Sequence, residues 1–160
     1  METSLHFAYK NGVLHVDDVA LTDLAARYGT PLYVYSKAAL IEHFRQYANT
    51  CKRFETDNLH SLVCYSVKSN SNLAILNLLG REGAGFDIVS GGELSRVVAA
   101  GCDPRKVIFS GVGKTAAEIR LALEYDILGF NIESSAELRR INRIAGEMGK
   151  QARISFRVNP

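Results

Sequence analysis

Gly85-Phe86-Asp87-Ile88-Val89-Ser90-Gly91-Gly92-Glu93-Leu94 combines a strand-length apolar run with the start of a helix. Residues 86–89 favour a short buried strand. Ser90 and Glu93 have the spacing of a capping box, in which a hydroxyl and a carboxylate satisfy two backbone N–H groups of the first helical turn. The stretch therefore predicts a strand followed at once by a helix, which together form one βα unit.

The same pattern recurs along the chain. Thr115-x-x-Glu118 and Ser134-x-x-Glu137 are two further capping boxes. Regular repetition of this kind predicts an α/β protein with a parallel sheet, either a doubly wound sheet or a (βα)8 barrel. A barrel usually takes about 250 residues, so about five units are expected to form only its N-terminal part. The strand-length apolar runs cover residues 62–67, 86–89, 107–109, 127–132 and 154–158.

The N-terminal region has a different pattern. Asn11-Gly12 stands between two β-favouring runs and predicts a hairpin over residues 7–16. We expect Asp17 and Asp18 to cap a helix that Gly29 ends. Two more elements are expected to follow: a short strand over residues 32–35 and an amphipathic helix over residues 36–53.

Composition excludes several classes of protein. The chain has 160 residues, of which 47% are hydrophobic and 22% charged, with a formal net charge of +2. The charges are balanced and form no long basic run, so neither nucleic acid nor a membrane surface is an expected partner. No apolar stretch approaches the roughly 20 residues needed to span a bilayer, and the N-terminus lacks a signal-peptide pattern, which predicts a cytoplasmic protein. The three cysteines and four histidines show no ligand spacing, and no metal site is expected.

Lys68 is the first candidate for chemistry. Strand alternation would place Lys68 on the same face as Cys64 and Ser66, at the carboxyl end of the run 62–67. Active sites of βα folds lie at that end, and partial desolvation there would favour the neutral amine that forms Schiff bases. The alternative is a lysine that extends from a strand end into solvent.

Several motifs carry a family resemblance. Tyr65-Ser66-Val67-Lys68-Ser69-Asn70-Ser71-Asn72 resembles the segment around the cofactor lysine of the fold-type III pyridoxal-phosphate decarboxylases, which include diaminopimelate, ornithine and arginine decarboxylases. Residues 85–94 are more similar to the diaminopimelate branch than to the others. Residues 31–35, 107–114 and 156–160 also match in order, so the resemblance covers nearly the whole chain.

The resemblance implies roles for four residues. Lys68 would hold pyridoxal phosphate as a Schiff base, and Asp87 would lie beside its amine and influence its proton. Glu93 and Arg157 match positions near the cofactor. Asp87 could instead act on a helix dipole, and the capping box is a sufficient explanation for Glu93. A buried Arg157 would need a carboxylate partner, either Glu133 or Asp87.

The resemblance also implies an organisation and an activity. Residues 1–35 would belong to a β-domain, and residues 36–160 would form a truncated pyridoxal-phosphate-binding barrel. The full-length protein would be a homodimer that converts meso-diaminopimelate, a small-molecule amino-acid substrate, to L-lysine and CO2. These 160 residues alone are expected to be inactive, and to self-associate or be unstable because the strand edges at 62–67 and 154–158 are exposed.

Two alternatives remain open. The first is another fold-type III enzyme, either an ornithine- or arginine-type decarboxylase or an alanine-type racemase. The second is a non-catalytic half-barrel that binds a dinucleotide or another cofactor. Gly111-x-Gly113-x-x-Ala116, followed about 20 residues later by Glu133, satisfies the relaxed dinucleotide fingerprint. Gly113-Lys114-Thr115 resembles the end of a phosphate-binding loop, but Ile108 stands where that loop requires glycine.

Overall fold

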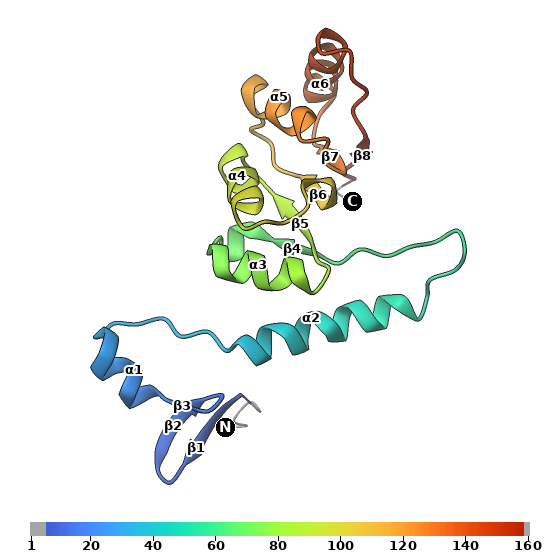
Figure 1. Ribbon diagram of the computed structural model, residues 1–160. Helices are drawn as coiled ribbons and strands as arrows, with labels where there is room; N and C mark the ends of the chain where they lie inside the picture. The colour runs from blue at the N-terminus through green and yellow to red at the C-terminus, as the bar shows by residue number, and fades with distance from the viewer. Residues whose placement is uncertain (1–5, 159–160) are drawn as a thin grey trace. The chain divides into compact units, whose positions relative to one another are not determined.

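The computed structural model describes residues 6–158 (Figure 1). Contacts within the chain divide it after Thr50 into two compact units, residues 1–50 and residues 51–160. The domain boundary between residues 35 and 36 that the sequence predicts stays a prediction. No helix of the described residues is long and apolar enough to cross a bilayer.

The first unit contains a small antiparallel sheet of three strands in the order β1 (Phe7–Lys10), β2 (Val13–Val16) and β3 (Val19–Ala20). Asn11 and Gly12 connect β1 and β2, with left-handed φ values of 52° and 79°. Asparagine and glycine tolerate this conformation, and the resulting turn matches the twist of the two strands. The hairpin predicted over residues 7–16 is therefore confirmed.

Helix α1 (Leu21–Tyr28) begins differently from the prediction. Its N-cap is Ala20, and no side chain accepts a hydrogen bond there. The expected cap by Asp17 and Asp18 is wrong, because strand β3 lies between these residues and the helix. The end of the helix agrees with the prediction, since Gly29 has a φ of 80° and its N–H donates to the Ala25 carbonyl at 2.9 Å.

The segment between α1 and α2 (Lys37–Lys52) is not the strand that was predicted over residues 32–35. These β-favouring residues pair with no strand of the described chain, and Tyr33 is 88% exposed. Ser36 then begins α2, because its buried hydroxyl accepts a hydrogen bond from the Ala39 N–H at 2.9 Å. The same hydroxyl donates to Asp17 Oδ1 at 2.7 Å, so Asp17 supports the start of α2 rather than that of α1.

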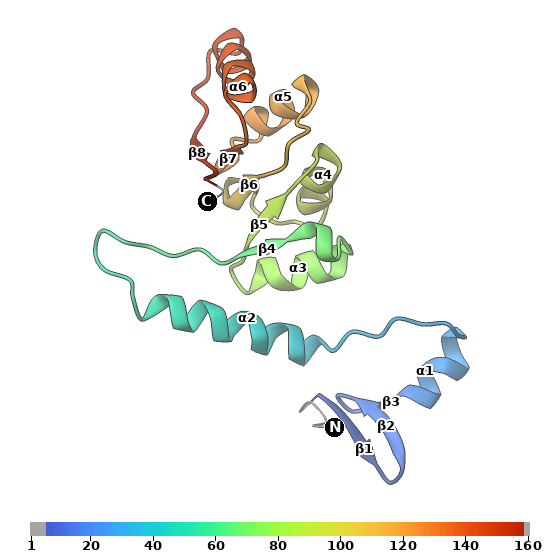
Figure 2. The same cartoon turned by 180° about the vertical axis from the view of Figure 1, so that it is seen from behind.

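The second unit contains a parallel five-stranded sheet, as predicted, in the order β4-β5-β6-β7-β8. Strand order follows chain order without the switch point of a doubly wound sheet, which favours the barrel arrangement. Figure 2 shows the helices that follow the strands on one side of the sheet. The strands are β4 (Cys64–Ser66), β5 (Gly85–Ile88), β6 (Val107–Phe109), β7 (Gly129–Ile132) and β8 (Ile154–Phe156). The helices are α3 (Leu73–Arg81), α4 (Gly91–Ala99), α5 (Ala116–Glu124) and α6 (Ser135–Glu147), with short 3-10 turns η1 (Val67–Ser69) and η2 (Pro104–Lys106).

The core of this unit lies between the sheet and its helices. Phe86 and Ile88 of β5 are fully buried there, whereas Asp87 between them is only half-buried. Phe109 and Phe130 of the next two strands stack with ring centroids 6.1 Å apart. Because side chains alternate along a strand, the face opposite this core carries the intervening residues.

The helix starts differ from the prediction in one respect. Thr115 and Glu118 form a complete capping box at the start of α5. In α4, the Ser90 hydroxyl accepts from the Glu93 N–H at 3.2 Å, but the Glu93 carboxylate accepts from the Val89 N–H at 2.8 Å. Helix α6 repeats this arrangement. In both helices, the carboxylate therefore accepts from the N–H of the residue before the N-cap and not from the N-cap itself.

A buried ion pair joins α5 and α6 to the sheet. The Lys114 side chain is completely buried, and its ammonium group donates to Glu137 Oε1 at 2.9 Å. It also donates to the carbonyls of Gly111 at 2.7 Å and Asn131 at 2.9 Å, and it lies over the Phe109 ring. All three N–H groups therefore have acceptors, which offsets the cost of burying the charge. Lys114 is a structural residue of the βα loop and does not form a phosphate-binding loop.

Replacement of Lys114 by methionine should strongly destabilise the fold. Lys114→Met leaves Glu137 buried without its partner, which we expect to cost about 3–5 kcal/mol of unfolding free energy in urea denaturation. Arg143→Met is the matched control, because Arg143 pairs with Glu147 on an exposed part of α6 and should contribute at most about 1 kcal/mol. Equal losses for the two variants would contradict the structural role of Lys114.

The stability of the helix starts should depend on pH through Glu118. The Gly91 N–H, which donates to Glu118 at 2.8 Å, and then the Thr115 N–H and hydroxyl lower the pKa of Glu118 below its ordinary value of 4.5. A carboxyl with a lowered pKa stabilises the fold above its unfolded pKa, and this contribution is lost as the pH falls through the folded value. The difference in unfolding free energy between the wild type and Glu118→Gln should therefore be constant near pH 7 and shrink below about pH 4.5. A pH-independent difference would contradict this.

Candidate functional site

A cavity of about 440 Å³ lies at the carboxyl ends of the parallel strands. The residues around it lie in the last two positions of a strand or in the segment that follows one, which is where parallel βα folds place their active sites. The cavity is lined by Lys68, Asp87, Val89, Ser110, Gly111, Asn131 and Arg157. It therefore brings together three of the four predicted site residues, while Glu93 is not among those that line it.

Lys68 reaches the cavity from a turn and not from the strand itself. Strand β4 ends at Ser66, which is the last residue that pairs with β5, and Lys68 lies in the 3-10 turn η1. The expectations that Lys68 ends the strand and is partly desolvated are both wrong, since its side chain is exposed. The turn nevertheless places the lysine at the cavity that Asp87 also lines.

Asp87 lies on β5 opposite Ser66 and faces the cavity. The Ser110 hydroxyl donates a hydrogen bond to Asp87 Oδ1. This partner belongs to the neighbouring strand segment and not to the start of α4. The contact therefore favours a cavity residue over a carboxylate that acts on the dipole of α4.

Arg157 has the first of its two predicted partners. Its guanidinium group donates to Glu133 Oε1 at 3.1 Å. The Arg157 side chain is largely exposed, so the partner is not required to compensate a buried charge. Glu133 Oε1 also accepts from the Gly111 N–H at 3.3 Å. One carboxylate thus joins the segments that follow β6 and β8. Because the Gly111 N–H already donates to Glu133, it is not free to bind the phosphate of a dinucleotide. This contact argues against the dinucleotide-binding alternative.

Glu93 supports the cavity from outside. Its carboxylate holds the N–H of Val89, and Val89 lines the cavity. Glu93 therefore fixes the backbone at one edge of the site, as the capping explanation implies. Its direct role in cofactor binding stays a prediction.

Sequence reasoning missed Ser110 and Asn131 as site residues. Asn131 Nδ2 donates to the Ser110 hydroxyl at 2.9 Å, on the same cavity that Asp87 lines. A signal was available in the sequence, because Asn131 stands between Phe130 and Ile132 within an apolar strand. Asp87 interrupts β5 in the same way, so two strands on either side of β6 each place one polar side chain opposite the core.

Ser66 has an unsatisfied hydroxyl beside this site. Its Oγ is buried and has no hydrogen-bond partner among the described residues. Ser66 pairs with Asp87 across β4 and β5, and it lies two residues before Lys68. A buried hydroxyl without a partner costs about 1–3 kcal/mol. Such a group next to a cavity is consistent with a ligand that completes the site.

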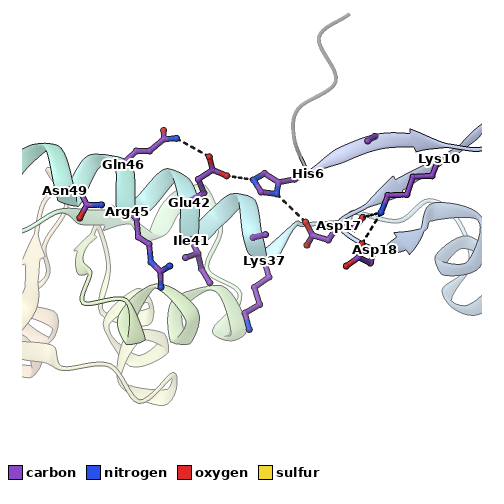
Figure 3. A pocket seen from close by; sticks show the side chains of 12 residues that line it. His6, Lys10, Asp17, Asp18, Lys37, Ile41, Glu42, Arg45, Gln46 and Asn49 are labelled. Atoms are coloured by element: carbon purple, nitrogen blue, oxygen red, sulfur yellow. Dashed lines mark hydrogen bonds and ion pairs between the residues drawn. The ribbon is translucent and has the colours of Figure 1, made fainter.

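The first unit has a larger hollow of about 910 Å³, between the hairpin and α2 (Figure 3). Several of its charged groups pair with one another. His6 Nε2 lies 2.6 Å from Glu42 Oε2, and Lys10 Nζ lies 3.0 Å from Asp18 Oδ1. None of the predicted site residues lies in this hollow. The smaller cavity at the strand ends is therefore the candidate active site.

Comparison with known proteins identifies the family. The family model described as pyridoxal-dependent decarboxylase, pyridoxal binding domain, matches residues 37–160. The chain belongs to this family. The predicted fold class, the N-terminal part of a fold-type III barrel with a preceding hairpin, is confirmed. The family's cofactor is pyridoxal phosphate, in agreement with the prediction.

Curated proteins that are similar to this chain are named diaminopimelate decarboxylase. The protein from Vibrio cholerae is 53% identical over 97% of this chain, and that from Pseudomonas aeruginosa is 52% identical over 96%. A crystal structure of diaminopimelate decarboxylase from M. jannaschii in complex with L-lysine is 37% identical, with a TM-score of 0.95 over 100% of this chain. The chain spans 36% of the length of the two curated relatives and 37% of the M. jannaschii chain.

Two half-buried cysteines, Cys64 and Cys102, provide a test of the Asp87 position. Burial raises the pKa of the Cys64 thiol, and the negative charge of Asp87 raises it further. Burial alone raises the pKa of Cys102. Asp87→Asn should therefore speed the alkylation of Cys64 by iodoacetamide near pH 8, because more thiolate forms. The rate at Cys102, measured by peptide mass spectrometry in the same sample, should stay unchanged. An unchanged Cys64 rate would show that Asp87 does not face it.

Proposed function

We propose that this chain provides the lysine-bearing part of the active site of a pyridoxal-phosphate-dependent decarboxylase that converts meso-diaminopimelate to L-lysine and CO2. The observation that carries the proposal is the cavity at the carboxyl ends of β4 to β8, which Lys68, Asp87 and Arg157 line together. The names of relatives more than 50% identical to this chain support the choice of substrate.

The residues of the cavity fit the proposed cofactor. An exposed lysine amine is accessible to an aldehyde, and Lys68 is the only lysine that lines this cavity among the described residues. A volume of about 440 Å³ lies within the range of small-molecule sites. Asp87 can accept a hydrogen bond or balance a positive charge, and the buried Ser66 hydroxyl has a free donor beside it.

Each residue has a distinct task in this proposal. The bound cofactor would supply an electron sink for the electron pair that remains when the substrate carboxylate leaves as CO2. Lys68 would hold the cofactor covalently and exchange with the substrate amine. Asp87 would stabilise the protonated state of the nitrogen at this link. Arg157, whose exposed guanidinium group Glu133 holds at 3.1 Å, would attract an anionic group to the cavity.

The proposal includes the organisation that the resemblance implies. Residues 1–35 would belong to a β-domain, residues 36–160 would form the first part of the barrel, and the whole protein would be a cytoplasmic homodimer. Glu93 would act near the cofactor through the backbone of Val89. These 160 residues alone would lack activity, because barrels of this kind usually bind a phosphate in loops after their last strands.

Borohydride reduction should locate the cofactor lysine. When the protein is incubated with an equimolar amount of pyridoxal phosphate and reduced, peptide mass mapping is expected to find the reduced adduct mainly at Lys68, because this is the lysine that lines the cavity in which the cofactor would bind. Lys68→Ala should abolish this label and the visible absorbance of the linked cofactor. Lys52→Ala is the matched control, since Lys52 is an exposed lysine in the last turn of α2 and should not affect the label.

The same experiment can refute the assignment. Label mainly at another lysine in the wild type, or undiminished label in Lys68→Ala, would overturn the role of Lys68. Lys68→Arg separates charge from chemistry, because arginine keeps the positive charge but does not form the link. We expect it to lose the label as completely as the alanine variant.

A further inference from the structure

Four polar side chains form a continuous hydrogen-bond network across neighbouring strands. The Ser155 hydroxyl donates to Asn131 Oδ1, and Asn131 Nδ2 donates to the Ser110 hydroxyl at 2.9 Å. The Ser110 hydroxyl then donates to Asp87 Oδ1. These residues come from β8, β7, the end of β6 and β5, which are consecutive in the sheet. We refer to Ser155, Asn131, Ser110 and Asp87 as the polar network.

The donors and acceptors of the network fix its direction. The Ser110 oxygen accepts from the Asn131 amide, so its own proton is directed to Asp87. The Asn131 amide has one orientation, because Oδ1 accepts from Ser155 while Nδ2 donates to Ser110. Asp87 is the last acceptor, and an ionised carboxylate suits this place because it accepts and does not donate. The network therefore ends in a carboxylate at the cavity.

The strands hold the network rigidly. Asn131 lies between Phe130 and Ile132, and both of these are buried in the core. Phe109, which directly precedes Ser110, is also buried. A side chain on a strand whose neighbours are packed in this way has little freedom to move. The buried neighbours therefore restrict the positions of the network side chains that line the cavity.

We propose that Ser110 and Asn131 are positioning residues that turn the Asp87 carboxylate toward the group held by Lys68. This inference rests on the proposed function. Oδ1 of Asp87 is occupied by Ser110, whereas Oδ2 accepts no hydrogen bond from the described residues. The network therefore fixes the carboxylate with one free oxygen at the cavity that Lys68 also lines. Asn131 acts indirectly, because it fixes the direction of the Ser110 hydroxyl.

The first test measures the hydrogen bonds of the network by NMR in the protein without cofactor. Ser110→Ala should shift the NMR resonances of the Asp87 carboxyl carbon and of the Asn131 side-chain amide, because both lose their shared partner. Ser110→Thr keeps the hydroxyl and should restore both resonances toward their wild-type positions. Ser95→Ala is the matched control, since the Ser95 hydroxyl donates to the Gly91 carbonyl on α4, away from the network. It should move neither resonance.

The second test measures how variants of the network change kcat and KM of the decarboxylation. In the holoenzyme, Ser110→Ala should lower kcat by roughly 10- to 100-fold, the effect expected when a reacting group is misplaced by about 1 Å. KM should change little, because Ser110 does not touch the substrate in this proposal. Ser110→Thr should recover most of kcat, and Ser95→Ala should keep the wild-type value. Ser155→Ala, which leaves the Ser110–Asp87 contact in place, should have a smaller effect than Ser110→Ala.

The outcomes separate this inference from the proposed function. Unshifted resonances in Ser110→Ala, or a threonine variant no better than the alanine variant, would overturn the positioning role. If Ser110→Ala does not fold, Asn131→Ala removes the donor that fixes the Ser110 hydroxyl, and an unshifted Asp87 carboxyl resonance with an unchanged kcat in this variant would also overturn it. Absence of label at Lys68 in the wild type would refute the proposed function, whereas the resonances would still report the network.

Discussion

The alternation of side chains along the parallel strands is the constraint on which the rest of this structure depends. Successive side chains on a central strand point alternately into the core and toward the opposite face of the sheet. On β5, Phe86 and Ile88 enter the core while Asp87 between them faces the cavity. On β7, Asn131 occupies the equivalent place between two buried residues. A register shift of one residue would bury both polar groups and expose the core, so the same burial that stabilises the sheet also specifies the site.

The loops between strands and helices depend on a second layer of contacts. Carboxylates near the helix starts hold backbone N–H groups at the ends of the strands, as Glu93 holds Val89. The buried Lys114 ammonium group binds the carbonyls of Gly111 and Asn131, and these two residues line the cavity. Neither charged residue is required to touch a ligand. They fix the backbone from which Ser110 and Asn131 extend, and this explains why a motif that resembles the end of a phosphate-binding loop has a structural role.

Features encoded locally could be predicted from the sequence, and features that depend on partners distant in the chain could not. The Asn11-Gly12 turn and the Thr115 capping box follow from neighbouring residues, and both are confirmed. The strand over residues 32–35 was wrong because β-favouring residues need a pairing strand, and the sequence does not show whether one is available. The expected desolvation of Lys68 failed for a related reason. The sequence places the lysine after an apolar run, but the end of the pairing with β5 at Ser66 decides where the strand stops.

The candidate site shows the same division between local and distant information. Lys68, Asp87 and Arg157 could be identified because the family motifs give each of them a role, whereas Asn131 is marked only as a polar residue within an apolar strand, and its contact with Ser110 depends on how the strands pair. The cross-strand pairing places Ser66 opposite Asp87 and Asn131 opposite Ser155, which the sequence alone does not reveal. In the first of these pairs, Ser66 has an unused hydroxyl and Asp87 has an oxygen without a donor. The buried Ser66 hydroxyl is costly in isolation, and a ligand that bonds to it would recover part of that cost on binding. The polar face of the sheet is therefore better explained as a surface prepared for a ligand than as one optimised for stability.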